Sequence, residues 1–230
     1  MPLAFRAVVR TLRTHYGAPP KPISRDPFRL IVWEQVAYLA SDTQRGQAYA
    51  LLRREVGLRP SDIMQSAPAT LAAITRVGGS IAAPVRAQRL HQSAERVLRV
   101  WHGDLAAALA LPVAQARKAL TPFPMIGEPG ADKILLFSRT ARLFALDSNA
   151  LRVLQRLGLI TKHADYRTLY RNAQAALAPA LNGTYVWLIA ASQLLRLHGQ
   201  TLCKAGAPRC EMCPLQRVCP STRLRRLAGT

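Results

Sequence analysis

Four cysteines near the C-terminus constrain the fold of this 230-residue chain more than any other feature of its sequence. They are its only cysteines and follow the spacing C-x6-C-x2-C-x5-C, as Cys203, Cys210, Cys213 and Cys219. Four thiols so close together suit one metal centre, either Zn²⁺ or an iron–sulfur cluster. Disulfide pairing is the alternative, but the N-terminal residues do not have the layout of a signal peptide, which favours metal binding. Structural zinc sites typically use two C-x2-C pairs and this segment has one, so the spacing favours a larger four-iron cluster over zinc.

The charge of the chain predicts a polyanionic partner. Lysine and arginine number 32 against 12 acidic residues, which gives a formal net charge of +20. Such an excess is typical of proteins that bind nucleic acid, although a basic, solvated surface without a partner is the alternative. A membrane is not expected as the partner, because the longest apolar run, residues 184–195, is too short to span a bilayer and contains Gln193.

The pattern of apolar residues predicts an all-α chain. Half of the residues are hydrophobic, which is enough for a substantial core. Apolar positions recur at helical spacing, and proline and glycine fall between the segments. The longest expected helices cover residues 3–16, 28–40, 84–101 and 183–199, with shorter helices between them.

The cysteine spacing resembles the iron–sulfur loop of the endonuclease III family of DNA glycosylases. The run Leu197-His198-Gly199, just before the first cysteine, and the pair Pro208-Arg209, inside the loop, resemble that family as well. The resemblance implies a [4Fe-4S] cluster held by the four cysteines, and double-stranded DNA as the partner. Two basic residues of this loop, Lys204 and Arg209, are expected to contact the DNA.

Residues 123–134 contain two glycines, Gly127 and Gly130, that alternate with Pro124 and Pro129 in front of an apolar helical run. A tight turn of this kind exposes backbone N–H groups that bind phosphate at a helix start; an ordinary helix–turn–helix connection is the alternative. The segment resembles the helix–hairpin–helix of the same family, with Met125 in place of its first glycine and with matches at Pro124, Ile126, Gly127 and Ala131. The residues expected to contact DNA here are Met125, Gly127, Gly130 and Lys133.

Asp147 precedes Ser148 and Asn149, which is typical of a helix N-cap. By the resemblance, the same aspartate falls on the family's essential catalytic aspartate when the segment after the hairpin is aligned without a gap. Pro129 falls where bifunctional members carry the lysine that forms a Schiff base with the sugar, and proline has no amine for this reaction. Lys133, four residues further along, is the alternative amine, although a phosphate contact or a solvated lysine is the simpler interpretation.

Glu34 lies inside an otherwise apolar predicted helix, where burial favours a protonated carboxyl that can act as a general acid. An exposed glutamate, or a salt bridge to one of the arginines, is the alternative. The setting of Glu34, seven residues after Pro27 in Asp26-Pro27-Phe28, resembles the adenine-mismatch branch of the family, in which this glutamate protonates the departing base. Leu39 stands where endonuclease III has a gap-filling glutamine, which implies a wedge between base pairs; a core leucine is the alternative.

The resemblance implies two all-α domains and DNA glycosylase activity. Residues 23–138 are expected to form a six-helix barrel with the helix–hairpin–helix, and residues 1–22 with 139–230 the iron–sulfur cluster domain. Asp147 and Glu34 together fit hydrolysis of an N-glycosidic bond by two carboxylates, as in base-excision repair. We therefore expect a monofunctional DNA glycosylase that acts as a cytoplasmic monomer, associated with the nucleoid in a bacterium. The alternatives are a bifunctional glycosylase with AP lyase activity and a non-catalytic protein that binds DNA structure.

Overall fold

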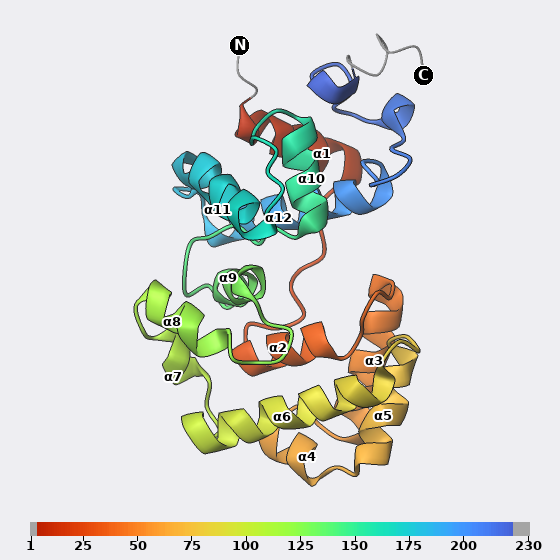
Figure 1. Ribbon diagram of the computed structural model, residues 1–230, viewed down its shortest axis with the longest axis vertical. Helices are drawn as coiled ribbons and strands as arrows, with labels where there is room; N and C mark the ends of the chain where they lie inside the picture. The colour runs from red at the N-terminus through yellow and green to blue at the C-terminus, as the bar shows by residue number, and fades with distance from the viewer. Residues whose placement is uncertain (1–3, 223–230) are drawn as a thin grey trace. The chain divides into compact units, whose positions relative to one another are not determined.

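The computed structural model describes residues 4–222, and these residues form helices, turns and loops without a β-strand. The predicted all-α fold is thus confirmed. The chain divides into two compact units (Figure 1). The central unit is Pro22–Thr140, and the terminal unit comprises the described residues on either side of it, 4–21 and 141–222. None of the helices within residues 4–222 is both long and apolar enough to cross a bilayer.

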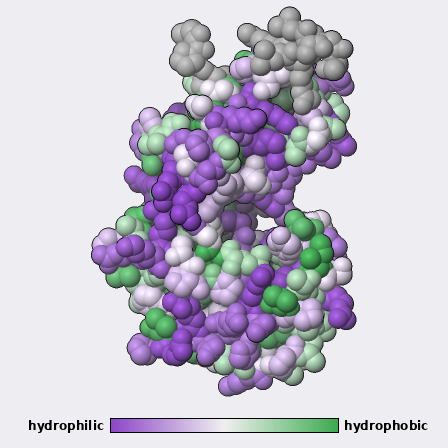
Figure 2. All heavy atoms as spheres, in the orientation of Figure 1, coloured by the Kyte–Doolittle hydropathy of each residue, from purple (hydrophilic) through white to green (hydrophobic). Residues whose placement is uncertain are grey.

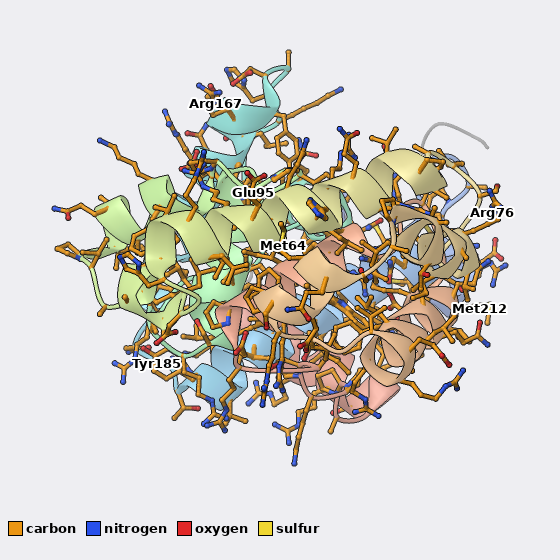
Figure 3. All side chains as sticks on the ribbon, turned by 90° about the horizontal axis from the view of Figure 1, so that it is seen from below. Met64, Arg76, Glu95, Arg167, Tyr185 and Met212 are labelled. Carbon is orange, nitrogen blue, oxygen red and sulfur yellow. The ribbon has the colours of Figure 1, made fainter. Side chains whose placement is uncertain are left out.

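The helices of the central unit are, in chain order, α2 (Pro27–Gln35), α3 (Asp42–Glu55), α4 (Pro60–Gln65), α5 (Pro68–Val77), α6 (Ala83–Trp101), α7 (Ala106–Leu109), α8 (Val113–Leu120) and α9 (Glu128–Phe137). The longest of them is α6, with 19 residues, and it packs against α2, α4 and α5. Its inward face buries Leu90 and Val97 completely. Figure 3 looks onto this packing, with Glu95 labelled on α6 and Met64 on the neighbouring α4. The core of the central unit is therefore built around one long amphipathic helix.

Short polar signals determine where helices of the central unit begin. The Asp26 carboxylate accepts a hydrogen bond of 2.9 Å from the backbone N–H of Arg29, and Pro27 occupies the first turn of α2. Ser41 and Gln44 cap α3 reciprocally, each accepting a hydrogen bond from the backbone N–H of the other. Both starts depend only on residues that are close together in the sequence.

The end of α2 differs from the prediction. The sequence predicts a helix to residue 40, whereas α2 ends at Gln35. Leu39 has a left-handed φ of 49°, which a right-handed helix does not tolerate. The backbone N–H of Tyr38 donates instead to the carbonyl of Gly78, at 3.4 Å, in the connection between α5 and α6. A contact with a distant segment therefore replaces the last turn of the predicted helix.

The terminal unit comprises α1 (Phe5–Tyr16), α10 (Ser148–Arg156), α11 (Tyr166–Leu177), α12 (Tyr185–Thr201) and the short 3-10 turns η1 (Ala178–Ala180) and η2 (Cys210–Met212). Both α1 and α10 pack against α12 (Figure 1). Gly199 of α12 makes the approach of α10 possible, because a Cβ at this position would lie 2.6 Å from the carbonyl oxygen of Asn149. This close contact brings the start of α10 next to the segment that carries the cysteines.

The positive charge of the chain lies mostly at its surface. Hydrophilic residues cover much of the face shown in Figure 2, with smaller hydrophobic patches between them. Among the arginines and lysines of residues 4–222, Arg86 is buried and the others keep part of their surface exposed. The field of these cations therefore acts on molecules outside the protein.

Candidate functional site

The four cysteine side chains line one pocket of the terminal unit. The pocket holds about 420 Å³ of space between protein atoms, part of it open to solvent. The residues that complete its wall include Val153, Arg156, Leu157, His198, Leu202, Pro208 and Leu215. Burial raises the pKa of the Cys213 thiol to about 11, and the neighbouring thiols add to this effect. Without a compensating cation, the Cys213 sulfur therefore stays protonated at neutral pH.

The four cysteines share the wall of one pocket. Within residues 4–222, no three His, Cys, Asp or Glu side chains are close enough together to hold a single ion. The four sulfurs are instead spread over the wall of one pocket, which is otherwise largely apolar. A bound cationic group would supply the charge that thiolates need there.

His198 connects this pocket to α1. Its Nε2 lies 3.5 Å from the Cys213 sulfur, and its Nδ1 lies 2.9 Å from the hydroxyl of Tyr16. The Tyr16 hydroxyl is also 3.0 Å from that of Thr201. Burial lowers the pKa of His198 to about 4, so the imidazole is neutral at physiological pH. His198 is therefore a neutral hydrogen-bonding group that fixes the N-terminal helix to the pocket wall.

Asp147 is the N-cap of α10. Its Oδ1 accepts a hydrogen bond of 2.9 Å from the backbone N–H of Ala150, so the capping role considered from the sequence is present. The other oxygen, Oδ2, accepts a bond from the Asn149 amide at 3.1 Å and lies 3.6 Å from Nε of Arg196. The side chain is 39% exposed. One oxygen is thus used by the helix, while the carboxylate remains accessible to another molecule.

Two neighbours of Asp147 were not identified from the sequence. Arg196 comes from α12, and the pKa of Tyr166 is raised by burial first and then by the charge of Asp147. Both residues lie far from Asp147 along the chain, and neither belongs to a motif. Only the packing of α11 and α12 around the start of α10 brings them to this carboxylate.

A chain of hydrogen bonds joins Asp147 to the cysteine segment. The side-chain amide of Asn149 donates to Asp147. Its side-chain oxygen in turn accepts a hydrogen bond of 2.7 Å from Nη2 of Arg152. Nε of the same arginine donates to the carbonyl of Cys203 at 2.8 Å. One turn later, Arg156 donates to the Cys203 sulfur at 3.3 Å and to the carbonyl of Lys204 at 2.7 Å. The position of Asp147 is therefore coupled to the conformation of the cysteine loop.

Glu34 and Lys133 form an ion pair within the central unit. Nζ of Lys133 on α9 lies 2.6 Å from Oε1 of Glu34 on α2. The side chain of Lys133 is 27% exposed and that of Glu34 is 26% exposed. The sequence suggested a salt bridge as one alternative for Glu34, with an arginine as its partner, whereas the partner is a lysine. The two residues, considered separately from the sequence, are thus brought together by the packing of α2 against α9.

The predicted hairpin connects α8 and α9. Phe123 and Ile126 anchor it in the core, while Met125 has a left-handed φ of 65° and an exposed side chain. Gln35 donates to the carbonyl of Pro124 at 2.8 Å, which fixes the hairpin to α2. Gly127 is the N-cap of α9 and is exposed, so the backbone at the helix start is open to solvent. The geometry suits an anion site, and contact of this turn with DNA stays a prediction.

Leu39 is 77% exposed, so its interpretation as a core leucine is wrong. Its loop lies against the connection between α5 and α6, where the backbone oxygen of Tyr38 would be 3.3 Å from a Cβ at Gly79. Ile81 in that connection is also exposed, and no pattern in the sequence predicts this. The buried guanidinium of Arg86 donates to the carbonyls of Thr75, Gly78 and Gly79. Two neighbouring loops thus present apolar side chains to solvent above one buried arginine.

The candidate residues are divided between the two units. Glu34, Leu39, Lys133 and the hairpin lie in the central unit, whereas Asp147 and the cysteines lie in the terminal unit. Lys204 and Arg209 are exposed on the cysteine loop. Each group is therefore organised by the packing of its own unit.

Comparison with known proteins gives a consistent set of relatives, although no family model matches the chain. The chain is 26% identical over 205 residues to the adenine DNA glycosylase of Mycobacterium tuberculosis H37Rv, covering 88% of the chain and 62% of that relative. It is 25% identical over 199 residues to endonuclease III of Sulfolobus acidocaldarius, covering 85% of the chain and 82% of the relative. With endonuclease III of Rickettsia conorii it shares 30% identity over 102 residues, 44% of the chain and 45% of the relative. The chain thus spans less than two thirds of two of these relatives.

Solved structures give the same fold. A non-covalent endonuclease III–DNA complex matches with a TM-score of 0.76 and 19% identity, covering 98% of this chain and 99% of that one. A thermostable thymine-DNA glycosylase matches with a TM-score of 0.72 and 17% identity, covering 96% and 97%. The chain is thus similar in sequence to endonuclease III and adenine DNA glycosylase, and similar in fold to endonuclease III-like helix–hairpin–helix DNA glycosylases.

Proposed function

We propose that this chain is a monofunctional DNA glycosylase of base-excision repair, which flips a damaged or mismatched base out of double-stranded DNA and hydrolyses its N-glycosidic bond. The observation that carries the proposal is the Asp147 carboxylate, which is fixed by the Ala150 backbone N–H yet remains 39% exposed. Relatives named as DNA glycosylases support the same conclusion.

The proposed mechanism uses two carboxylates. Cleavage of the bond between C1′ and the base leaves positive charge on the sugar, and the base must first leave the duplex stack. The Asp147 carboxylate stabilises this charge, because one of its oxygens is held in place before the substrate binds. Glu34 is the second catalytic carboxylate. Water then completes the hydrolysis at C1′.

DNA contacts are proposed from the exposed groups on both units. The backbone N–H groups at the start of α9, next to Met125, Gly127 and Gly130, bind a phosphate. Lys204 and Arg209 add positive charge from the cysteine loop, and Leu39 fills the gap left by the flipped base. The protein acts on double-stranded DNA as a cytoplasmic monomer, with no membrane partner.

The cysteine pocket is proposed to hold a [4Fe-4S] cluster. Cys203, Cys210, Cys213 and Cys219 are its ligands, since all four side chains line this pocket. When bound, the cluster supplies positive charge that keeps the thiolates ionised and ties the cysteine loop into one structure. Arg152 and Arg156 connect that loop to α10 and so to Asp147.

A base-release assay tests the proposed chemistry. Duplexes that carry damaged or mismatched bases are incubated with the enzyme, and strand breaks are measured with and without later alkali. Because Pro129 has no amine, we expect base release without strand cleavage, breaks only after alkali, and no covalent adduct after borohydride reduction. Efficient borohydride trapping would show that the reaction runs through a lysine, with Lys133 as the first candidate. A Pro129→Ala variant is the control, since it also lacks an amine and should give the same products.

DNA binding is expected to depend steeply on salt because of the +20 charge. For a contact with about five phosphates, the slope of log Kobs against log salt is roughly −4 to −5. Lys204→Ala and Arg209→Ala should each reduce the magnitude of the slope by about 1. Arg54→Ala, which removes an arginine already paired with Glu55, serves as the matched control. A slope near zero would exclude the nucleic-acid partner.

A further inference from the structure

An ion pair joins Glu34, one of the proposed catalytic carboxylates, to Lys133. Its members come from α2 and α9, and the atoms Nζ and Oε1 are 2.6 Å apart. Both side chains are about three-quarters buried, so solvent screens the pair only in part. Nζ of Lys133 also lies 5.7 Å from the ring centre of Phe137, which restricts the positions open to the ammonium.

An ammonium at this distance favours the ionised carboxylate over the protonated one. The helices that pack against α2 are α3, α6 and α9. Besides Lys133, these helices carry seven acidic or basic side chains that are buried or partly buried. They are Arg45, bound to the carbonyls of Trp33 and Glu34; Arg86, bound to three carbonyls; Arg89, whose charge acts on Arg86; His91; Arg96, over the ring of Phe123; Glu128; and Asp132, paired with Arg117. The Lys133 ammonium is in direct contact with the Glu34 carboxylate.

We infer that Lys133 is a positioning residue that keeps Glu34 ionised during base release, which restricts the substrate to bases that leave without a proton from Glu34. This inference rests on the proposed glycosylase function. In the reaction, the oxygen of water adds to C1′ and one of its protons passes to the Glu34 carboxylate. The bond between C1′ and the base nitrogen breaks, and its electron pair goes to the base.

The charge of the leaving base then determines which substrates react. An N-alkylated purine carries a positive charge before cleavage and becomes neutral when it takes the electron pair, so it needs no acid. Mismatched adenine is neutral and leaves as an anion unless an acid protonates it. A site whose Glu34 is held as a carboxylate therefore fits N-alkylated purines better than adenine.

The protonation state of Glu34 is measured in the protein without DNA, by following its side-chain carboxyl with ¹³C NMR during a pH titration. In Lys133→Met, the carboxyl should titrate at least about one pH unit higher than in the unmodified protein, a tenfold change in its ionisation constant. Lys133→Arg keeps the cation and should restore the original midpoint. Lys118→Met removes the same charge from an exposed position on α8 and should leave it unchanged. Equal midpoints for the unmodified protein and Lys133→Met would overturn the inference.

Single-turnover base release provides the second measurement, with duplexes that carry N7-methylguanine or adenine opposite guanine. The unmodified enzyme should release the methylated base at least about tenfold faster at pH 7.5. At pH 6, Lys133→Met should lose the fraction of that activity that equals the fraction of Glu34 protonated at this pH, as given by its measured midpoint. At pH 8.5 it should lose little, because protonation of Glu34 removes the proton acceptor. Lys133→Arg should behave as the original. Adenine release that accelerates as Glu34 protonates in the unmodified enzyme would show that Glu34 is the acid. If the titration supports the pair but no duplex loses a base, the glycosylase function fails while the ion pair stands.

Discussion

Asp147→Asn is expected to reduce single-turnover base release by about three orders of magnitude. The substitution removes the negative charge that faces the developing sugar cation, which is typically worth this much in a partly enclosed site. Asparagine is as good an N-cap as aspartate, so the hydrogen bond from the Ala150 backbone N–H is kept and the stability of α10 should change little. DNA affinity should remain within about threefold, because the carboxylate acts on the transition state rather than on the bound duplex.

Asp165→Asn is the matched control for this variant. Asp165 caps α11 in the same unit and accepts a hydrogen bond of 2.7 Å from the backbone N–H of Thr168. The two variants thus make the same chemical change at two helix starts, and only the one at Asp147 should affect base release. Full activity of Asp147→Asn would mean that the aspartate is a helix cap and nothing more, and the proposed mechanism would be wrong.

The second large effect concerns the cysteine pocket. The purified protein should be brown and contain about four irons per chain, and Cys213→Ser should lose both the colour and most of the iron. Loss of a structural metal site costs about 4 kcal/mol, which for a chain of this size lowers the thermal midpoint by roughly 8–16 °C. Absorbance near 400 nm, iron analysis and thermal unfolding are the measurements.

Met212→Ser is the control for the cysteine variant. Met212 lies on the same loop, is 65% exposed and is labelled in Figure 3. The Met212→Ser substitution introduces the same serine without removing a proposed ligand. The colour, the iron content and the thermal midpoint of this variant should therefore be unchanged. A colourless protein with one zinc per chain, or a Cys213→Ser variant of full stability, would rule out the cluster as proposed.

Features that depend on neighbouring residues were predictable from the sequence. Asp147 was predicted to precede a helix as its N-cap, and it accepts a hydrogen bond from the first turn of α10. The cysteines needed no tertiary information either, because all four lie in one short segment. Local chemistry and spacing were sufficient in these cases.

Features that depend on packing were not predictable. The helix expected to reach residue 40 ends at Gln35, because the Tyr38 backbone bonds to Gly78 in another connection. Lys133 was considered as a free amine or a phosphate contact, yet its partner Glu34 lies on a helix far away in the sequence. No periodicity or motif encodes such pairs, since they follow from how the helices are arranged.

Arg86 has a consequence for the kinetics of the DNA recognition proposed above. By holding the carbonyls of Thr75, Gly78 and Gly79, it gives the connection after α5 a fixed shape, and the loop of Leu39 rests on that connection. The entropy lost in ordering these two loops is therefore incurred when the chain folds, before any duplex arrives. Under the proposed function, this preformed apolar tip tests successive base pairs during a brief encounter, so the search along DNA need not wait for the protein to rearrange.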